Sequence, residues 1–484
     1  MKLRPIAAVA AAVAAVAAAV ISATPAHAAA PSARHVVVVG ISGLEWSDIT
    51  PGTNLYQIAG QGSAGALVDY ATLPLTCPAD GWLTLNAGAR ADLKHRESGP
   101  CPALPAVANG AVSGMAGIVG YNASQGYSPT WGALRTGLGC AVAAGPGAAL
   151  ALADPSGRVS AYVASPGDLT EADLARCPLT VIDLGVLPPG APSDGSHGSV
   201  AARATAVRAA DAVLGRLAAE LPPGTTLLLT SAGSLVKSRL GVAVISGNGY
   251  HAGLLHAVST RQPGLVVITN LTSTVRALLG EAPGGTVITS GSRVSLPTAI
   301  GDFTATATAE RVWTSTHSLF FWTYALADAL VLAGIAPASW GASPGRRRRR
   351  AGLWRVAGVF AAAMPAGTFL AGLVPWARQS HPAAWLYGAS LAIGLVLGGA
   401  ALAAGRQRRL RDDLIAPFGM ICLFTVIVLG IDVMAGSRLQ LETPFGLSLL
   451  EAGRFYGIGN EALGIYGIAA LGGAGWLGLR MSRD

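Results

Sequence analysis

The chain has 484 residues, of which 51% are hydrophobic and 12% are charged, and its formal net charge is +8. Soluble domains carry about 25% charged residues, so this composition excludes a wholly soluble protein and predicts a large part within a membrane. The positive charge is concentrated after residue 316, where there are 15 basic and 8 acidic residues. Because these basic residues lie between apolar segments, they leave no basic surface for DNA or RNA, and a nucleic-acid partner is excluded.

The first residues have the pattern of a secretory signal. Lys2 and Arg4 precede an apolar run, residues 6–21, and Ala26-His27-Ala28 follows as an A-x-A cleavage site. The run is shorter than the ~20 residues of a membrane span. The sequence therefore predicts a signal peptide, residues 1–28, cut after Ala28, with a permanent N-terminal anchor as the alternative.

Residues 29–316 alternate predicted strands with predicted helices. The clearest segments are the strands His35–Gly40, Thr225–Thr230 and Leu265–Thr269 and the helices Ala201–Leu221 and Ser273–Leu279. Strands that alternate with helices form a mostly parallel sheet covered on both faces. We therefore expect an exported α/β domain with a mostly parallel sheet, followed by an all-α transmembrane bundle in residues 317–484.

The ends of the predicted strands are the first places to look for chemistry. Ligands of open parallel sheets bind at the carboxyl ends of the strands. Gly40–Gly43 and Thr230–Gly233 follow two of the predicted strands. Asp183 ends a further strand, where it could bind a ligand or simply cap the turn that follows.

Four of the five cysteines fall in the exported domain: Cys77, Cys101, Cys140 and Cys177. An even number of cysteines in an exported domain predicts disulfides, here two. The order along the chain favours Cys77–Cys101 and Cys140–Cys177, but three pairings are open.

Five apolar stretches follow residue 316, each near the ~20 residues of a span. They are residues 317–335, 353–374, 384–404, 415–435 and 462–479. With the exported domain outside, the connecting segments and the tail place 12 arginines inside and 3 outside. This asymmetry follows the positive-inside rule. The sequence predicts a multi-pass plasma-membrane protein with its large domain extracellular and its C-terminus cytoplasmic, in contact with the lipid bilayer.

Four polar residues lie in or beside these stretches: Asp328, Asp432, Asn460 and Glu461. Polar groups within a bilayer are costly, so each is a candidate for function. The alternative is that Asp432 and Glu461 reach the membrane surface and that Asp328 pairs with another helix.

Three segments of the exported domain together resemble a known family. They are Thr72–Gly81, Leu227–Gly233 and Ser259–Thr274. In this order they resemble the alkaline phosphatase superfamily, especially its nucleotide pyrophosphatase/phosphodiesterase branch. The resemblance implies a phosphoric ester hydrolase with two zinc ions and places Thr76 at the position of the nucleophile.

The chain departs from the pattern of that family at the metal ligands. Ser42 stands at the first ligand position in place of Asp, and Ala232-Gly233 replaces the Asp-His pair. Ala79 replaces the Asn that would steady the oxyanion. Zinc needs three or four donor atoms in a defined geometry, so these losses predict that no metal is bound and that Thr76 is only a vestigial nucleophile.

Other residues could still take part in a site. Asp194 and His197 resemble a ligand pair with a spacing one residue too short, and His251 or His256 could stand for the final His of the family. The binding residues that we predict are Ser42, Asp80, Asp183, Asp194, His197 and His251.

The favoured hypothesis is a pseudoenzyme: the exported domain binds an envelope ligand or partner, such as a lipid or polymer, without a cofactor. The first alternative is an active metal-dependent phosphodiesterase or phosphatase of the cell envelope, which would need zinc. The second is a component of the transport of lipid-linked precursors, in which the helices move the lipid.

Overall fold

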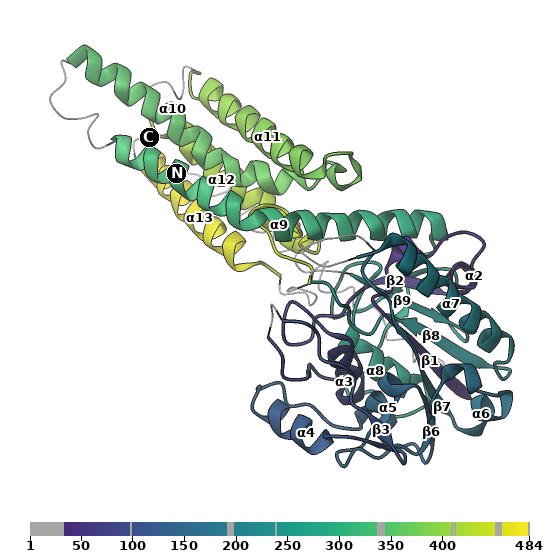
Figure 1. Cartoon of the computed structure of the whole chain (residues 1–484). Coiled ribbons are helices and arrows are strands. Elements are labelled where there is room, and N and C mark those ends of the chain that lie inside the picture. The colour runs from purple at the N-terminus through teal and green to yellow at the C-terminus, as the bar shows by residue number, and fades with distance from the viewer. Residues whose placement is uncertain are drawn as a thin grey trace.

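The computed structural model describes residues 33–482, except for 97–98, 191–197, 238–239, 336–343, 408–409, 411–412 and 451–456. The predicted signal peptide lies outside the described residues. The described chain forms an α/β domain and a bundle of long helices that extends away from it (Figure 1).

The α/β domain is built on a ten-stranded sheet. The strand order is β12-β10-β2-β9-β8-β1-β7-β5-β6, and β11 pairs with β2. The strands are β1 His35–Ser42, β2 Ser63–Val68, β5 Ala141–Ala144, β6 Ala161–Val163, β7 Leu179–Val186, β8 Thr225–Thr230, β9 Gly241–Ser246, β10 Gly253–His256, β11 Leu265–Val267 and β12 Thr289–Ser290. Among these strands, β9 is antiparallel to β2 and β8, and β12 to β10, while the other pairs are parallel. The predicted fold class, a mostly parallel α/β domain followed by helices, is confirmed.

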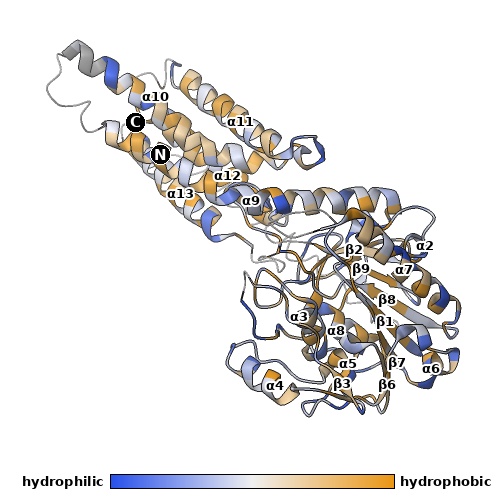
Figure 2. Cartoon of the chain, viewed as in Figure 1, coloured by the Kyte–Doolittle hydropathy of each residue, from blue (hydrophilic) through white to orange (hydrophobic). Residues whose placement is uncertain are grey.

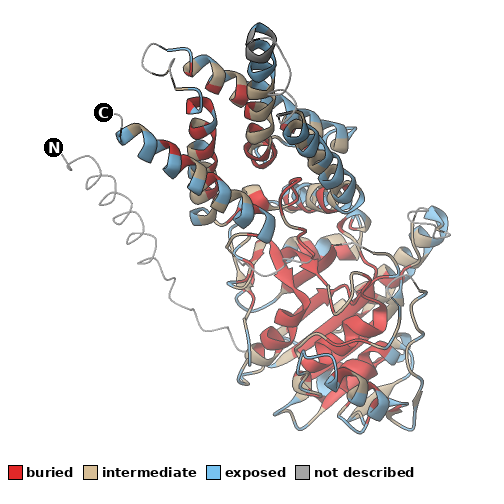
Figure 3. Cartoon of the chain, turned by 90° about the vertical axis from the view of Figure 1, so that its left-hand side faces the viewer, coloured by how far each residue is buried: buried red, intermediate tan, exposed pale blue. Residues whose placement is uncertain are grey.

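Helices cover both faces of the sheet because the central strand β1 is apolar on both. Val36 and Val38 belong to one hydrophobic core with α3 (Pro78–Ala87), α5 (Pro146–Leu152) and α8 (Ile268–Leu278). Val37 and Val39 belong to the other core with α2 (Asn54–Gln61), α7 (Val200–Ala219) and the start of α9 (Leu296–Ile335). A run of β-branched residues buried on both sides is typical of a central parallel strand, and Figure 3 shows buried residues throughout the sheet.

Smaller elements complete the domain. They are β3 Val107–Ala108, β4 Ala111–Val112, α4 Met115–Ala123 and α6 Glu171–Arg176, with single 3-10 turns at Trp46–Asp48, Ala133–Arg135 and Pro166–Asp168. The β3–β4 hairpin stands apart from the main sheet.

One predicted boundary differs from the structure. The strand expected at Leu265–Thr269 ends at Val267, and α8 begins at Ile268 instead of Ser273. The reason is the helical spacing of four apolar residues, all of which are buried: Ile268, Leu271, Val275 and Leu278. In the structure this helical spacing has more influence than the preference of the β-branched residues at the start of the segment for a strand.

Two disulfides close loops of the domain. Cys77 pairs with Cys101, and Cys140 pairs with Cys177, each with Cα atoms 5.4 Å apart. These are the pairs that the sequence order favoured. Cys422 is free and buried among the C-terminal helices.

The C-terminal part is helical. Its helices after α9 are α10 Pro344–Ala371, α11 Pro382–Ala404, α12 Ala416–Met434 and α13 Asn460–Met481, with 3-10 turns at Trp376–Arg378 and Arg438–Gln440. Among the described residues, four segments are long and apolar enough to cross a membrane: Arg349–Ala371, Pro382–Ala404, Ala416–Met434 and Asn460–Met481. They match four of the five predicted spans, and apolar residues cover much of their outer surface (Figure 2).

The fifth predicted span, residues 317–335, is the second half of α9 and is not among these four. It includes the polar residues His317, Tyr324 and Asp328. Its placement in the bilayer therefore stays a prediction, as does the orientation of the bundle.

Helix α9 joins the two parts of the molecule. Near its start, the Phe303 ring lies 4.7 Å from the ring of Trp46 in the α/β domain. Farther along, Thr316 accepts a 2.5 Å hydrogen bond from Tyr387, and Tyr324 donates one of 3.0 Å to the carbonyl of Ala361. The helix thus runs unbroken through the predicted domain boundary at residues 316 and 317.

The segment between α12 and α13 returns to the α/β domain. The buried Glu310 of α9 accepts hydrogen bonds from the Ser448 hydroxyl, at 2.7 Å, and from the Leu449 amide, at 2.9 Å. Gln262 of the α/β domain donates to the carbonyl of Gly436 at 2.6 Å. The domain is therefore docked on the bundle by α9 and by this returning segment.

Candidate functional site

The segments that resemble the phosphatase family meet at the carboxyl edge of the sheet. The Ser42 hydroxyl at the end of β1 donates a 2.8 Å hydrogen bond to the carbonyl of Ala232, which follows β8. The Ser234 amide donates to the carbonyl of Thr76 at 2.8 Å. The structure thus brings Ser42, Thr76 and the end of β8 together, as the order of the motifs predicts.

Thr76 is buried in this arrangement. Its hydroxyl oxygen accepts a 2.9 Å hydrogen bond from the Ala71 amide. The next residue, Cys77, is the N-cap of α3 and is tied to Cys101. The hydroxyl therefore helps to hold the loop before α3.

Gly233 stands where the family resemblance expects a metal ligand, and the backbone of Cys77 lies close to it. Gly233 has a φ of +77°, and a Cβ atom there would lie 2.4 Å from the carbonyl oxygen of Cys77. A Cβ at Gly81 would likewise lie 2.4 Å from the backbone of Ala232. A side chain at Gly81 is opposed by the short contact alone, and one at Gly233 is opposed by both the short contact and the left-handed backbone.

The donor atoms of this region do not fit a two-zinc site. Among the described residues, one group of three potential ligands lies within 4.8 Å: Cys77, Asp80 and His95. Cys77 is in a disulfide and offers no thiolate. Two donors remain, fewer than the three or four that zinc requires, so we derive no metal-dependent step from this site.

Asp80 is a predicted binding residue, and in the structure it organises the start of α3. Its carboxylate accepts hydrogen bonds from the amides of Cys77, at 2.7 Å, and Leu93, at 2.8 Å. It also lies 2.9 Å from Nε2 of His95. Burial raises the pKa of Asp80 to about 6, while the amide bonds and His95 oppose the rise.

Two further carboxyls near this edge were not predicted. Asp69 directly follows β2, and burial raises its pKa to about 7. Asp92 accepts a hydrogen bond from the Thr72 hydroxyl, and burial raises its pKa as well. Asp80, Asp92 and His95 are near enough to interact electrostatically, and we call them the acidic cluster.

The surface beside the acidic cluster is formed by an arginine and two tyrosines. The Arg90 guanidinium lies 4.8 Å from the ring centroid of Tyr70 and 5.8 Å from that of Tyr127. Cation–π contacts of this kind hold Arg90 in place. Tyr127 is 39% exposed, so the group is open to solvent.

Asp183 has a structural role. Its carboxylate accepts hydrogen bonds from the amides of Gly147, at 2.8 Å, and Gly185, at 2.9 Å. The first contact caps the N-terminus of α5, and the second fixes the turn at the end of β7. Burial raises the pKa of Asp183, and the two amides oppose the rise.

His251 lies at the other edge of the sheet. Its carbonyl accepts a hydrogen bond from Ser63, the first residue of β2, and its Nδ1 lies 2.8 Å from the Ser290 hydroxyl. The structure therefore does not bring His251 to Thr76. Asp194 and His197 lie outside the described residues.

The polar residues of the bundle differ in their surroundings. Asp432 is buried and accepts hydrogen bonds from the Leu439 amide and the Gln440 side chain. Asn460 and Glu461 are exposed in the first turn of α13. Asp328 lines a cavity between the helices.

Sequence reasoning missed Asp69, Asp92 and His95. Asp69 could have been found from the apolar residues Ala64–Val68 that precede it, but alanine and glycine weaken the strand signal there. His95 stands 15 residues after Asp80 in a loop, and no spacing rule connects the two.

Comparisons with known proteins give structural matches. A scan against protein-family models finds no match, and no curated protein matches. One matching structure is a protein of the alkaline phosphatase superfamily from Vibrio parahaemolyticus, with 13% identity, a TM-score of 0.30, and coverage of 55% of this chain and 74% of that one. That protein belongs to the superfamily that the three sequence segments resemble.

Two other matching structures are a murine and a bacterial protein. Murine ectonucleotide pyrophosphatase/phosphodiesterase 5 has 17% identity and a TM-score of 0.26, over 42% of this chain and 57% of that one. The lipoteichoic acid synthase LtaP from Listeria monocytogenes has 11% identity and a TM-score of 0.31, over 58% and 78%. Because all these TM-scores lie below 0.5, we interpret the site from the residues of this chain.

Proposed function

We propose that the protein is a membrane-anchored pseudoenzyme whose phosphatase-like domain binds a ligand or partner of the cell envelope. The observation that carries the proposal is the backbone packing of Gly233 against Cys77. A histidine at Gly233, which the Asp-His pair of the family would require, would collide with the backbone of Cys77. We place this domain outside the plasma membrane and the C-terminus inside, after a cleaved signal peptide, because the arginine distribution and the A-x-A site favour this topology.

The experiment that tests the loss of catalysis uses the full chain purified in detergent. We expect no stoichiometric zinc by elemental analysis. We also expect that hydrolysis of bis-p-nitrophenyl phosphate does not change in Thr76→Ala. Thr205→Ala, on the exposed face of α7, is the matched control. Bound zinc together with a turnover that only Thr76→Ala abolishes would show instead a phosphodiesterase.

The binding surface that we propose is formed by Tyr70, Arg90 and Tyr127. Tyrosine and arginine are enriched at the centres of binding interfaces. A stacked guanidinium and aromatic rings can contact the sugar rings and the anionic groups of an envelope polymer at the same time.

Sedimentation with purified bacterial cell walls tests this surface. We expect the full chain to bind and Tyr127→Ala and Arg90→Gln each to weaken binding several-fold. Val200→Ala, at another exposed apolar position, is the control. Equal binding of all four proteins would show that the polymer, if bound, is held elsewhere, and this surface would be abandoned.

A further inference from the structure

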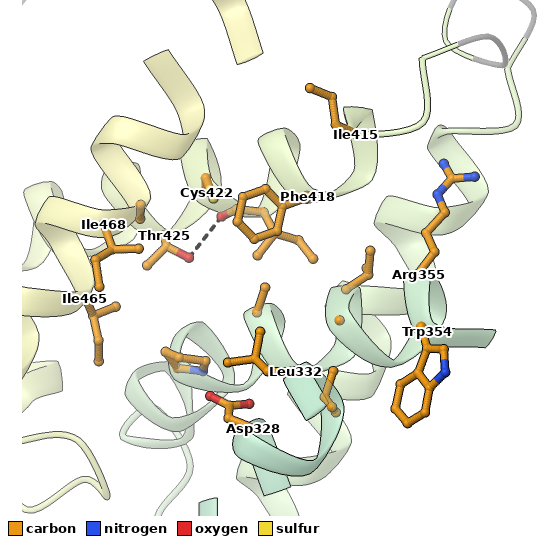
Figure 4. A pocket seen from close by; sticks show the side chains of 18 of the residues that line it. Asp328, Leu332, Trp354, Arg355, Ile415, Phe418, Cys422, Thr425, Ile465 and Ile468 are labelled. Atoms are coloured by element: carbon orange, nitrogen blue, oxygen red, sulfur yellow. Dashed lines mark hydrogen bonds between the residues drawn. The ribbon is translucent and has the colours of Figure 1, made fainter. Parts of the chain in front are cut away.

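The helical bundle contains a large cavity. Its volume is about 980 Å³, and α9, α10, α12 and α13 form its walls (Figure 4). Most of the lining side chains are apolar, among them Leu332, Phe418 and Ile468. This volume is at the upper end of what small-molecule sites enclose, and the walls suit a hydrocarbon chain.

The cavity is elongated along the helices. Its lining residues on α10 extend from Ala351 to Pro365. At 1.5 Å per residue these positions span about 21 Å, most of the ~30 Å hydrocarbon thickness of a bilayer. A long chain that lies parallel to the lipid chains therefore fits the shape of the cavity.

One end of the cavity carries an arginine. The Nε atom of Arg355 is buried and has no hydrogen-bond partner. Arg355 is the seventh residue of the apolar segment Arg349–Ala371 of α10, and Figure 4 shows its guanidinium pointing away from Asp328. Helical side chains lean toward the N-terminus of their helix, which for α10 is the end that the arginine distribution places at the cytoplasmic surface.

Asp328 lies deeper than Arg355. Gly334, six residues after Asp328 on α9, packs directly against Trp354. Six residues of helix correspond to about 9 Å, so the carboxyl and the guanidinium are separated along the cavity. An anionic group beside Arg355 would therefore not lie next to Asp328.

The rims of the cavity are open to the surrounding lipid. Leu332 of α9 is 68% exposed and Ile468 of α13 is 71% exposed, although both line the cavity. A lipid could enter sideways from the bilayer without passing through the hydrated domain.

We propose that this cavity binds an anionic membrane lipid, with its phosphate group on Arg355 and its hydrocarbon chain along α10. A guanidinium whose buried Nε atom has no hydrogen-bond partner can pair with a phosphate group, and the negative cytoplasmic leaflet supplies lipids that carry one. The lipid site does not depend on whether the α/β domain is catalytic.

The test uses the full chain in detergent, with bound lipid measured by native mass spectrometry. The probes are dioleoyl phosphatidic acid and dioleoyl phosphatidylcholine. We expect phosphatidic acid to bind about tenfold more tightly and Arg355→Gln to remove this preference. Arg349→Gln, an exposed arginine one and a half turns earlier on the same helix, is the matched control for diffuse charge attraction.

A second variant tests the cavity itself. Gly358 lines the cavity, and a Cβ there would meet no atom within 4 Å, so Gly358→Phe fills the space without a backbone clash. We expect it to abolish binding of both lipids, while Gly388→Phe, at an exposed position of α11 with the same freedom, leaves binding unchanged.

Three outcomes would overturn the proposal. They are equal losses in Arg349→Gln and Arg355→Gln, undiminished binding in Gly358→Phe, and competition by inorganic phosphate alone. The first would indicate diffuse attraction, the second would indicate lipid on the outer surface, and the third would indicate an anion site without a role for the chain. Equal thermal transitions of all variants would establish that they fold alike.

Discussion

The α/β domain and the helical bundle differ in where they leave space. In the α/β domain the strand ends, where sites of this architecture form, are filled by backbone from Thr76 to Gly81 and from Ala232 to Gly233. The bundle shows no comparable motif in the sequence, yet it encloses a cavity of about 980 Å³. Among the described residues, the large cavity therefore lies in the region without recognisable motifs.

The largest expected effect on stability comes from adding a side chain at the carboxyl edge of the sheet, where backbone segments pack closely. Gly233→Ala should lower the free energy of unfolding by about 3 kcal/mol or more, because it adds both a strained φ and a short contact with Cys77. Denaturant titration of the full chain in detergent measures the change.

Gly280→Ala is the matched control for this substitution. Gly280 has a φ of +78°, and a Cβ there would meet no atom within 4 Å. Gly280→Ala should therefore lower the free energy of unfolding only through backbone strain, by about 1 kcal/mol. Similar decreases in the free energy of unfolding for Gly233→Ala and Gly280→Ala would contradict the tight packing at Gly233.

The next largest effect on stability concerns the disulfide Cys77–Cys101, which lies beside Thr76. Replacing Cys77 and Cys101 together by serine should lower the free energy of unfolding by about 2–4 kcal/mol, because the loop of 24 residues is no longer closed in the unfolded chain. Thermal unfolding with and without reductant checks this, since the double variant should no longer respond to reductant at this loop. A wild-type protein that is insensitive to reductant would count against the prediction.

The smallest effect concerns the contact between the two regions. Burial and the neighbouring Glu310 raise the pKa of Glu442 well above its usual value. The folded protein therefore keeps this proton to a higher pH than the unfolded chain does. The stabilisation that protonated Glu442 contributes is complete at a pH below its pKa in the unfolded chain, near 4.5. It is lost as the pH rises toward the pKa of Glu442 in the folded protein.

Glu442→Gln should remove that loss. We expect its melting temperature at neutral pH to be a few degrees higher than that of the wild type and the difference to vanish near pH 4. Melting curves over this pH range measure it, with Glu461→Gln, exposed at the start of α13, as the control. A difference that is the same at every pH would mean that Glu442 does not titrate in this way.

The sequence predicted the strongly patterned parts of the molecule. The valines of β1 and the apolar face of α7 form the expected strand and helix, and of the three possible cysteine pairings the structure has the one that the sequence order favoured. Strand β2 was missed because Ser63–Val68 consists mostly of small residues, and Asp69 was missed with it.

The chemistry of the site was harder to predict than its position. The structure brings the segments of Ser42 and Thr76 together, whereas His251 lies at the opposite edge, because its place depends on which strand β10 pairs with. The cavity could not be predicted at all, since Asp328, Arg355 and Ile468 come from three helices whose packing is not encoded by any local spacing.

Helix α9 has 40 residues, about 60 Å of helix without a break. One end carries Phe303 against the sheet domain, and the other carries Asp328 and Leu332 in the cavity wall. Because the helix is continuous, a tilt of the sheet domain would also move Asp328 and Leu332 in the cavity wall. If a polymer binds as proposed, its effect on the tilt of the domain would therefore reach the lipid site through α9.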